Sequence, residues 1–423
     1  MSHDPDSDDP AVSGDAAGPM TARALWRDRG FSAAAIIAVV VALGFGIVVP
    51  LLPLFARSFD VSLFAATSLV SVFAGVRLAS NLYTGALTDR IGTRRAVGWG
   101  ALIVAVSSVL AGASPGYWWL LVFRGLGGFG SALFFNALLA HVVLLVPPTF
   151  RGRAIAMLQG AFLFGITLGP TVGTLLAAPL GLRWPFVIYG GFCVAAAWVA
   201  FALLPRAPAR SADDPAPERG VRPLLRTAAR FCADPTFVVA LVLMAAARWA
   251  ATGVRFSVVP IFGEEVVGVG VVGVGLAVTI SSLGHVATLW PAGRIIDTKG
   301  RRVLAAPAYA AFAAASAALV LSGSLWTFLL LMLLYGIGTG LTSVTPPAIV
   351  GDVTEPKDAG KAMGVLNTAG DLGSVAGPLV SGWLADAAGY GWGFGASAGL
   401  LLAAAIVALR MRETLPAARA DAA

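Results

Sequence analysis

The chain has 423 residues, of which 58% are hydrophobic and only 12% are charged, and its mean hydropathy is +0.83. A soluble domain of this length does not have this composition, so the sequence excludes a water-soluble protein and indicates a membrane protein. The net charge of +7 would suit nucleic-acid binding, but the order of the segments explains it differently.

Twelve apolar segments follow one another along the chain, each long enough for a membrane crossing of about 20 residues. Ahead of them, residues 1–20 carry five Asp and lack an apolar centre, so 1–30 is expected to be a disordered acidic tail and not a signal peptide. Pro50 and Pro53 are expected to kink the first helix near its end. The helices are predicted near 30–56, 63–88, 96–113, 117–140, 154–177, 184–204, 235–262, 269–292, 303–322, 325–349, 362–385 and 391–409.

A polar segment divides these helices into two groups of six. Residues 205–234 are rich in Pro, Arg and Asp and too polar to cross, so they are expected to be a cytoplasmic linker between a bundle at 31–204 and a bundle at 235–409. A C-terminal tail occupies 410–423. With the N-terminus in the cytoplasm, 23 of the 29 Lys and Arg fall in the tails and inward loops, and two fall in outward loops. This is the positive-inside pattern, so the basic charge reflects topology, both termini are expected in the cytoplasm, and no nucleic-acid partner is expected.

The two halves repeat each other at an offset of 208 residues. The segment GALTDRIGTRR at 85–95 returns as GRIIDTKGRR at 293–302, and Gly169-Pro170 returns as Gly377-Pro378. Internal repetition of this length predicts two homologous six-helix bundles, hence an all-α integral membrane protein with 12 transmembrane helices.

Three motifs resemble those of the major facilitator superfamily, and the resemblance extends over residues 30–415. The loop between the second and third helices is similar to the family's signature loop, with Thr93 where a basic residue is common; its residues are Gly85, Asp89, Arg90, Gly92, Arg94 and Arg95. A fourth-helix motif is matched by Arg124, Gly125, Gly127 and Gly128. The fifth helix resembles the family's antiporter motif, with Thr174 where a second Gly is usual; its residues are Gly165, Gly169, Pro170 and Gly173.

The resemblance implies the major facilitator fold and a secondary transporter, with a fifth helix similar to that of the drug-efflux branch. In the family, the acid of the signature loop contacts the other half when the cytoplasmic side closes, and this role is carried over to Asp89 alone. The second copy of the loop comprises Gly293, Asp297, Gly300, Arg301 and Arg302. Because Thr298 and Lys299 depart from the pattern, Asp297 is expected to have a structural role inside its own half.

Ionisable side chains at membrane depth are costly and are therefore expected to mark the transport pathway. Arg248 and Arg255 are seven residues apart and are predicted to share one face of a helix, although snorkelling of Arg255 to the outer interface is an equal alternative. His285 is the repeat equivalent of Arg77. The predicted substrate and proton pathway comprises Arg77, Arg124, Arg248, Arg255, His285, Asn367 and Asp371.

Asp371 is the one acid deep in a predicted membrane segment, which makes it the expected proton carrier. It lies 10 residues above Lys361, or ~15 Å, and Arg77 lies 12 residues above Asp89, or ~18 Å. These depths allow an ion pair between the halves, which is expected to form when the cytoplasmic side closes. The alternative is that Arg77 faces its own bundle.

The sequence favours a secondary transporter over two other classes of membrane protein. It has no clustered His or paired carboxylates for a membrane-embedded enzyme and no Gly-x-x-x-x-Gly-Lys-Ser/Thr for an ATP-driven pump. We expect proton-coupled efflux of a drug-like or metabolite molecule, without cofactor or metal, by a monomer in the inner membrane of a bacterium. The excess of Arg among the buried candidates leaves uptake or exchange of an organic anion as the alternative.

Overall fold

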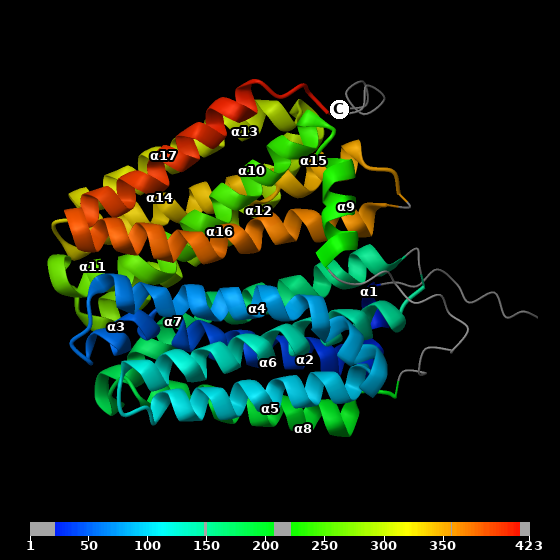
Figure 1. The fold of residues 1–423 in the computed structure, drawn as a ribbon, viewed down its shortest axis with the longest axis horizontal. Helices are drawn as coiled ribbons and strands as arrows, with labels where there is room; N and C mark the ends of the chain where they lie inside the picture. Colours follow the sequence, from blue (N-terminus) through cyan, green and yellow to red (C-terminus); the bar gives the residue numbers. More distant parts are fainter. Residues whose placement is uncertain (1–21, 148–149, 207–220, 357, 415–423) are drawn as a thin grey trace, which may run out of the picture.

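The computed structural model describes residues 22–147, 150–206, 221–356 and 358–414, and in these ranges the chain forms helices, turns and no strand. The first and second halves form two bundles that lie side by side (Figure 1). This confirms the predicted all-α fold of two homologous bundles. The helices α1 (Ala22–Arg27) and α9 (Val221–Phe231) and the C-terminal end of α17 (Tyr390–Leu409) lie at one end, called here the terminal end (Figure 1). The helices α3 (Leu51–Arg57) and α11 (Val259–Phe262) lie at the opposite, distal end (Figure 1).

The first bundle contains six long helices, the first of which is broken. Helix α2 (Arg29–Val48) ends at a turn containing Pro50, and the chain resumes as α3 (Leu51–Arg57). Proline has no backbone N–H to donate, so the break falls where the sequence predicts a kink. The other helices are α4 (Leu63–Ile91), α5 (Thr93–Gly112), α6 (Tyr117–Leu144), α7 (Arg151–Leu180) and α8 (Trp184–Leu203).

Two helices of the second bundle are less regular than predicted. Helix α10 (Pro235–Trp249) continues as a π-helix over Ala250–Val258, then as α11 (Val259–Phe262) and a second π-turn. Helix α14 (Leu325–Ser343) is interrupted ahead of two prolines and continues as α15 (Thr345–Val353). The prediction of one regular helix at 235–262 is therefore corrected. The sequence has no periodic pattern that distinguishes short runs of i→i+5 turns from α-helical turns. The other helices are α12 (Gly270–Lys299), α13 (Arg301–Ala318), α16 (Ala359–Ala388) and α17 (Tyr390–Leu409).

Eleven helices in the described ranges are long and apolar enough to cross a membrane. The twelfth, α16, has sufficient length at 30 residues but is less apolar, because it carries Lys361, Asn367, Asp371 and Asp386. It packs against α4 of the first bundle and against α10 and α17 of its own. Its polar residues therefore lie on a helix of the second bundle that packs against α4.

Two segments expected to be irregular contain helix. Helix α1 (Ala22–Arg27) and the start of α2 fall inside the tail predicted at 1–30, because Leu25 is buried and the Asp28 side chain caps α2 by accepting from the backbone of Phe31. The linker at 205–234 contains α9 (Val221–Phe231). The remainder of the predicted tails and linker, at 1–21, 207–220 and 415–423, lies outside the described residues.

The repeat is visible in equivalent helix contacts. A Cβ on Gly128 of α6 would lie 2.5 Å from the backbone oxygen of Phe73 on α4. A Cβ on Gly336 of α14 would collide in the same way with the backbone oxygen of Ser281 on α12, and both residues lie 208 positions after their counterparts. Small residues allow such close approach of helices in a membrane, so these glycines serve packing.

Candidate functional site

The centre of the site is an ion pair between the two bundles. The Nη2 atom of Arg77 on α4 lies 3.5 Å from Oδ1 of Asp371 on α16, and the two side chains are 34% and 13% exposed. The predicted ion pair between the halves is thereby confirmed. A distance of 3.5 Å is long for a direct hydrogen bond, so the pair is loose and partly accessible to water.

A polar network in the first bundle supports this pair. The Asn81 Nδ2 atom lies 3.5 Å from the second oxygen of Asp371, and Asn136 on α6 donates to Asn81 Oδ1 at 3.0 Å and to Thr84 Oγ1 at 2.9 Å. Asn136 thus orients the Asn81 amide so that its NH₂ group points to Asp371. The sequence analysis missed these residues, although Asn81 and Thr84 follow Arg77 at the helical spacing of four and seven.

Arg248 on α10 approaches the ion pair from the second bundle. Its guanidinium interacts electrostatically with Arg77 and Asp371, and its side chain packs over Gly370 of α16 while remaining exposed. His285 on α12 interacts electrostatically with Arg248 and Arg255. The structure therefore brings Arg77, Arg248, His285 and Asp371 into one region, in which positive charge exceeds negative.

Arg255 lies apart from Arg248. It is 5% exposed, its guanidinium carbon lies 4.3 Å from the centre of the Phe256 ring, and it interacts electrostatically with Tyr335. The prediction that Arg248 and Arg255 share a face is wrong, because the wider turn of the π-helix from Ala250 rotates the later residues away. Snorkelling does not occur either, since the side chain is buried within the bundle.

Arg124 is enclosed in the first bundle. It is 2% exposed, its guanidinium carbon lies 4.7 Å from the centre of the Phe73 ring, and its Nε atom has no hydrogen-bond partner among the described residues. Cation–π contact partly replaces the missing acid. Asn367, in contrast, lies one turn from Asp371 on α16 and is exposed. The structure thus places Asn367 near the ion pair and Arg124 inside a bundle.

The bundles are in close contact from the ion pair to the distal end. Ser71 of α4 donates to the Val375 backbone oxygen of α16 at 2.7 Å, and Thr171 of α7 donates to Thr279 Oγ1 of α12 at 2.8 Å. At the distal surface, Arg57 Nε lies 2.7 Å from Glu265 Oε1. These contacts join both pairs of facing helices, so the distal side is closed.

The same face of α16 is open toward the terminal end. Gly360, Gly364 and Asn367 precede Asp371 by 11, 7 and 4 residues, so they lie on its face of the helix, and all three are exposed. Apart from the adjacent residues and backbone of α16 itself, no described atom lies within 4 Å of the position of a Cβ on Gly360 or Gly364. Asp371 therefore lies where the closed distal part of the interface meets an open terminal part. The ion pair is present in this conformation, in which the terminal side is open.

The two copies of the charged loop differ in their contacts. In the second copy, Arg301 pairs with Asp297 at 3.4 Å and with Asp352 at 2.8 Å, while its backbone N–H donates to Glu413 at 2.8 Å. The expected internal role of Asp297 is thus confirmed. In the first copy, Thr93 occupies the position of Arg301 and bonds His141 Nδ1 at 2.9 Å. The charge cluster of the second half therefore has no equivalent at Thr93.

Glycines at the ends of both loops have a clear backbone role. Gly92 and Gly300 adopt φ values of +83° and +101°, which other residues rarely adopt, and each joins two consecutive helices. Asp89 and Arg90 are exposed at the end of α4. Arg94 donates to the backbone oxygen of Phe201 on α8, so it holds two helices of its own bundle together.

The fifth-helix motif packs α7 against α2. A Cβ on Gly165 would lie 2.5 Å from the Val39 backbone oxygen, and a Cβ on Gly169 would lie 2.5 Å from the Gly46 Cα. Gly173 likewise contacts the backbone of Ile47. The motif therefore shapes the first bundle, and its glycines do not face the ion pair.

We expect Gly169→Ala to lower the thermal stability of the purified protein, because the added methyl group would push α2 and α7 apart at a backbone contact. Overpacking of this kind costs about 1–3 kcal/mol. Gly160→Ala is the matched control on the same helix, since its Cβ would meet nothing within 4 Å. There the higher helix propensity of Ala should leave the melting temperature unchanged or raise it. Equal melting temperatures for the two variants would contradict the packing role.

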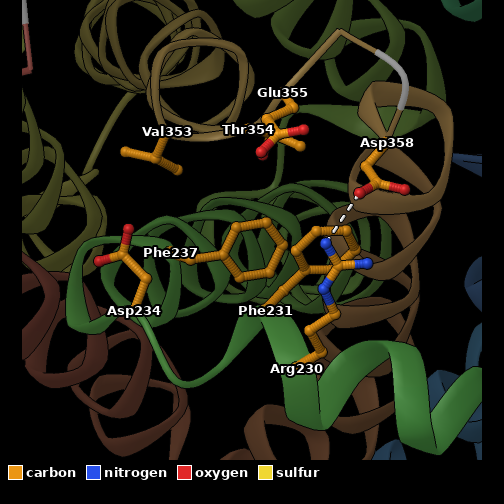
Figure 2. A pocket seen from close by; sticks show the side chains of 8 residues that line it. All are labelled: Arg230, Phe231, Asp234, Phe237, Val353, Thr354, Glu355 and Asp358. Carbon is orange, nitrogen blue, oxygen red and sulfur yellow. Dashed lines mark ion pairs between the residues drawn. The ribbon is translucent and has the colours of Figure 1, made fainter.

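A small cavity lies at the terminal end, away from the ion pair. It has a volume of about 180 Å³ and lies between α9, the start of α10 and the segment that joins α15 to α16 (Figure 2). Arg230 points across it to Asp358 at 3.1 Å, and the rings of Phe231 and Phe237 stack at 5.1 Å beside it (Figure 2). Pockets for drug-sized molecules have about 300–1,000 Å³. The cavity is the place where the linker helix docks on the second bundle.

Comparison with known proteins identifies the family. The sequence model of the Major Facilitator Superfamily matches residues 34–275 and 244–422. The chain belongs to this superfamily.

Within the Major Facilitator Superfamily, curated relatives include two bacterial proteins. Multidrug resistance proteins 2 and 1 of Bacillus subtilis (strain 168) are each 28% identical to this chain, over 37% and 41% of its length. The matched regions span 38% and 44% of those proteins, so the chain matches less than half of their length.

Solved structures of this superfamily have the same fold. A bacterial homologue of the human lysosomal transporter Spinster, in an inward-facing and unoccupied conformation, has a TM-score of 0.70 at 16% identity, covering 90% of this chain and 95% of that one. The human organic anion transporter MFSD10 has a TM-score of 0.66 at 20% identity, covering 90% and 99%. At these identities the likeness establishes the fold. The chain is therefore a multi-pass membrane protein with the fold of this superfamily.

Proposed function

We propose that the protein exports a small drug-like or metabolite molecule in exchange for protons, by alternating access. The observation that carries this proposal is the Arg77–Asp371 ion pair, which joins the two bundles where the closed part of their interface meets the open part. An ionisable pair at the boundary between two moving bodies can change its protonation when they separate. Binding and conformational change, without covalent chemistry, account for the proposed activity.

We assign the terminal end to the cytoplasm. The basic residues that the sequence places in inward loops include Arg90, Arg94, Arg301 and Arg302, and all four lie at the terminal ends of their helices. By the positive-inside rule this end faces the cytoplasm, in the inner membrane of a bacterium, with both termini inside. The structure then represents an inward-facing conformation of a monomer.

The proposed cycle uses the two environments of Asp371. When the distal side opens, Arg77 and Asp371 separate, and burial without a partner favours the neutral acid, so a proton enters from outside. When the distal side closes, Arg77 again favours the ionised carboxylate and the proton leaves to the cytoplasm. The bundles rock about this level, as in other secondary transporters.

Uptake or exchange of an organic anion is the second candidate. The observation that favours it is the excess of positive charge at the ion pair, where Arg77 and Arg248 both interact with one acid, Asp371. Such an excess attracts anions into a site of low dielectric constant. This candidate uses the same bundles and the same alternation.

Purified protein in liposomes, tested with an imposed pH gradient and a panel of amphiphilic compounds, distinguishes these functions. If the protein exports its substrate in exchange for protons, a panel compound should accumulate on the acidic side of the membrane, from which the protons leave. Collapse of the pH gradient should abolish this accumulation. Movement of compound and proton in the same direction would favour uptake. No gradient-dependent movement of any compound would contradict proton coupling.

We expect Asp89→Asn to impair transport while leaving the protein folded and inserted, because the proposed latch needs a charge at the cytoplasmic end of α4. The outward-facing state would lose a contact between the halves, and the transport rate should fall about tenfold, which corresponds to about 1.4 kcal/mol. Asp297→Asn is the matched control, since that acid pairs inside its own bundle with Arg301. Wild-type transport by correctly inserted Asp89→Asn protein would contradict the latch.

A further inference from the structure

Arg248 is the cation of the site that lacks a partner of its own. Its guanidinium forms no hydrogen bond or ion pair with any residue that the structure describes, whereas Arg77 pairs with Asp371. Yet it is close enough to both residues to interact with them electrostatically, and its side chain is exposed. An arginine among membrane helices that remains exposed beside the ion pair faces the open part of the interface.

The charges around Arg248 do not balance. Arginine stays protonated in proteins, so with Asp371 ionised the three side chains Arg77, Arg248 and Asp371 carry a net charge of +1. Arg255, with two guanidinium nitrogens that have no partner within the described chain, adds positive potential at His285, which also interacts with Arg248. A single negative charge on a ligand would neutralise the trio.

The backbone makes room for this arrangement at one position. A Cβ on Gly370 would lie 3.1 Å from Cγ and 3.5 Å from Nε of Arg248. Gly370, the residue before Asp371, therefore allows the aliphatic part of the Arg248 side chain to lie across α16. A Cβ at this position would press on the Arg248 stem, which would have to shift by a few tenths of an ångström.

We propose that Arg248 is an anion-binding subsite that takes the acidic headgroup of an amphiphilic substrate, such as a carboxylate, while Arg77 remains paired with Asp371. The planar guanidinium offers two parallel N–H donors to a carboxylate, which a lysine ammonium does not. The apolar part of the substrate extends along the open face of α16 past Asn367. This inference rests on the proposed transport function and adds the charge of the substrate.

Three fluorescent probes that differ only in charge test the subsite. Pyrenebutyrate, pyrenebutanol and pyrenebutylamine are titrated into purified full-length protein, and energy transfer from tryptophan to pyrene reports binding. We expect the wild type to bind the carboxylate about tenfold more tightly than the alcohol, the size expected of one charge-assisted interaction, and the amine most weakly. Equal affinity for carboxylate and alcohol would overturn the proposal, whatever the variants do.

Variants place the effect at Arg248. Arg248→Gln should abolish the preference for the carboxylate, Arg248→Lys should retain part of it, and Gly370→Ala should reduce it. Arg226→Gln, which changes an exposed residue of α9, is the control and should bind like the wild type. A preference for the carboxylate that is unchanged in Arg248→Gln would overturn the assignment. Equal preferences in Arg248→Gln and Arg248→Lys would also overturn it.

Two further experiments distinguish the proposed subsite from a site for inorganic anions and from the proposed transport function. Inorganic phosphate should displace pyrenebutyrate only at far higher concentration, and displacement at equal concentration would show a site for small inorganic anions instead. Proton-driven transport of neutral compounds with no preference for anions would refute the subsite and leave the proposed function intact. A preference for anions without any pH-gradient effect would do the reverse.

Discussion

The Asp371→Asn variant is expected to bind substrate but to lose all accumulation driven by a pH gradient. Asparagine has nearly the same shape, and its single side-chain oxygen can still accept from one of the two donors, Arg77 or Asn81, which lie 3.5 Å from the two carboxylate oxygens. It cannot take up or release a proton, so the gradient no longer drives the cycle. We expect accumulation in proteoliposomes to fall at least about tenfold, to the level of passive entry, which corresponds to about 1.4 kcal/mol or more.

The same substitution elsewhere on α16 provides the control. Asp386 is exposed at the distal end and accepts a hydrogen bond from the Leu63 backbone at 3.1 Å, which an asparagine oxygen can also do. Asp386→Asn should therefore retain most gradient-driven transport. If Asp371→Asn protein accumulated substrate as the wild type does, Asp371 would not be the proton carrier, and His285 would be the next residue to test.

The second large effect is expected from removing one partner of the ion pair. Arg77→Ala and Asp371→Ala should each lower thermal stability in detergent, because each leaves a charge within the membrane without its counterion. One third of the Arg77 side chain is exposed, so the cost is nearer about 1–2 kcal/mol than that of a fully buried pair. The double variant should be less unstable than the sum of the two single variants.

The two single variants should also differ from each other. Arg248 interacts with both members of the pair, so Asp371 keeps a cation beside it when Arg77 is removed. Removal of Asp371 instead leaves two arginines facing each other. We therefore expect Asp371→Ala to be the less stable variant. Strictly additive effects in the double-mutant cycle would show that Arg77 and Asp371 do not interact.

Much of the fold can be predicted from the sequence because membrane helices obey simple physical limits. The apolar runs have the length of a crossing, and the repeat at an offset of 208 is reproduced by the equivalent contacts of Gly128 and Gly336. The Arg77–Asp371 pair could be predicted because helix rise converts residue number into depth. Matching depths on facing helices leave little freedom for where two such side chains can meet.

The remaining features depend on information that a helical period does not contain. The π-helix that begins at Ala250 turns Arg255 away from the face of Arg248. No residue between the two arginines predicts a π-helix. The approach of Arg248 to Asp371 depends on Gly370, whose neighbours in space cannot be read from the chain. The open and closed parts of the interface are a property of the conformation, so the sequence could predict the partners of the ion pair but not the conformation in which they meet.

The central claim is that protonation of Asp371 controls which side of the transporter is open, and paired spin labels test it most directly. One pair, at Ala156 and Thr298, lies on exposed positions toward the terminal end, and another, at Leu180 and Val266, toward the distal end. The exposed Cys232 is replaced by Ser, and Cys193 is buried. Lowering the pH should shorten the terminal distance and lengthen the distal one in the wild type, with no such pH response in Asp371→Asn. Distances that do not change with pH in the wild type, or that change equally in Asp371→Asn, would contradict the account.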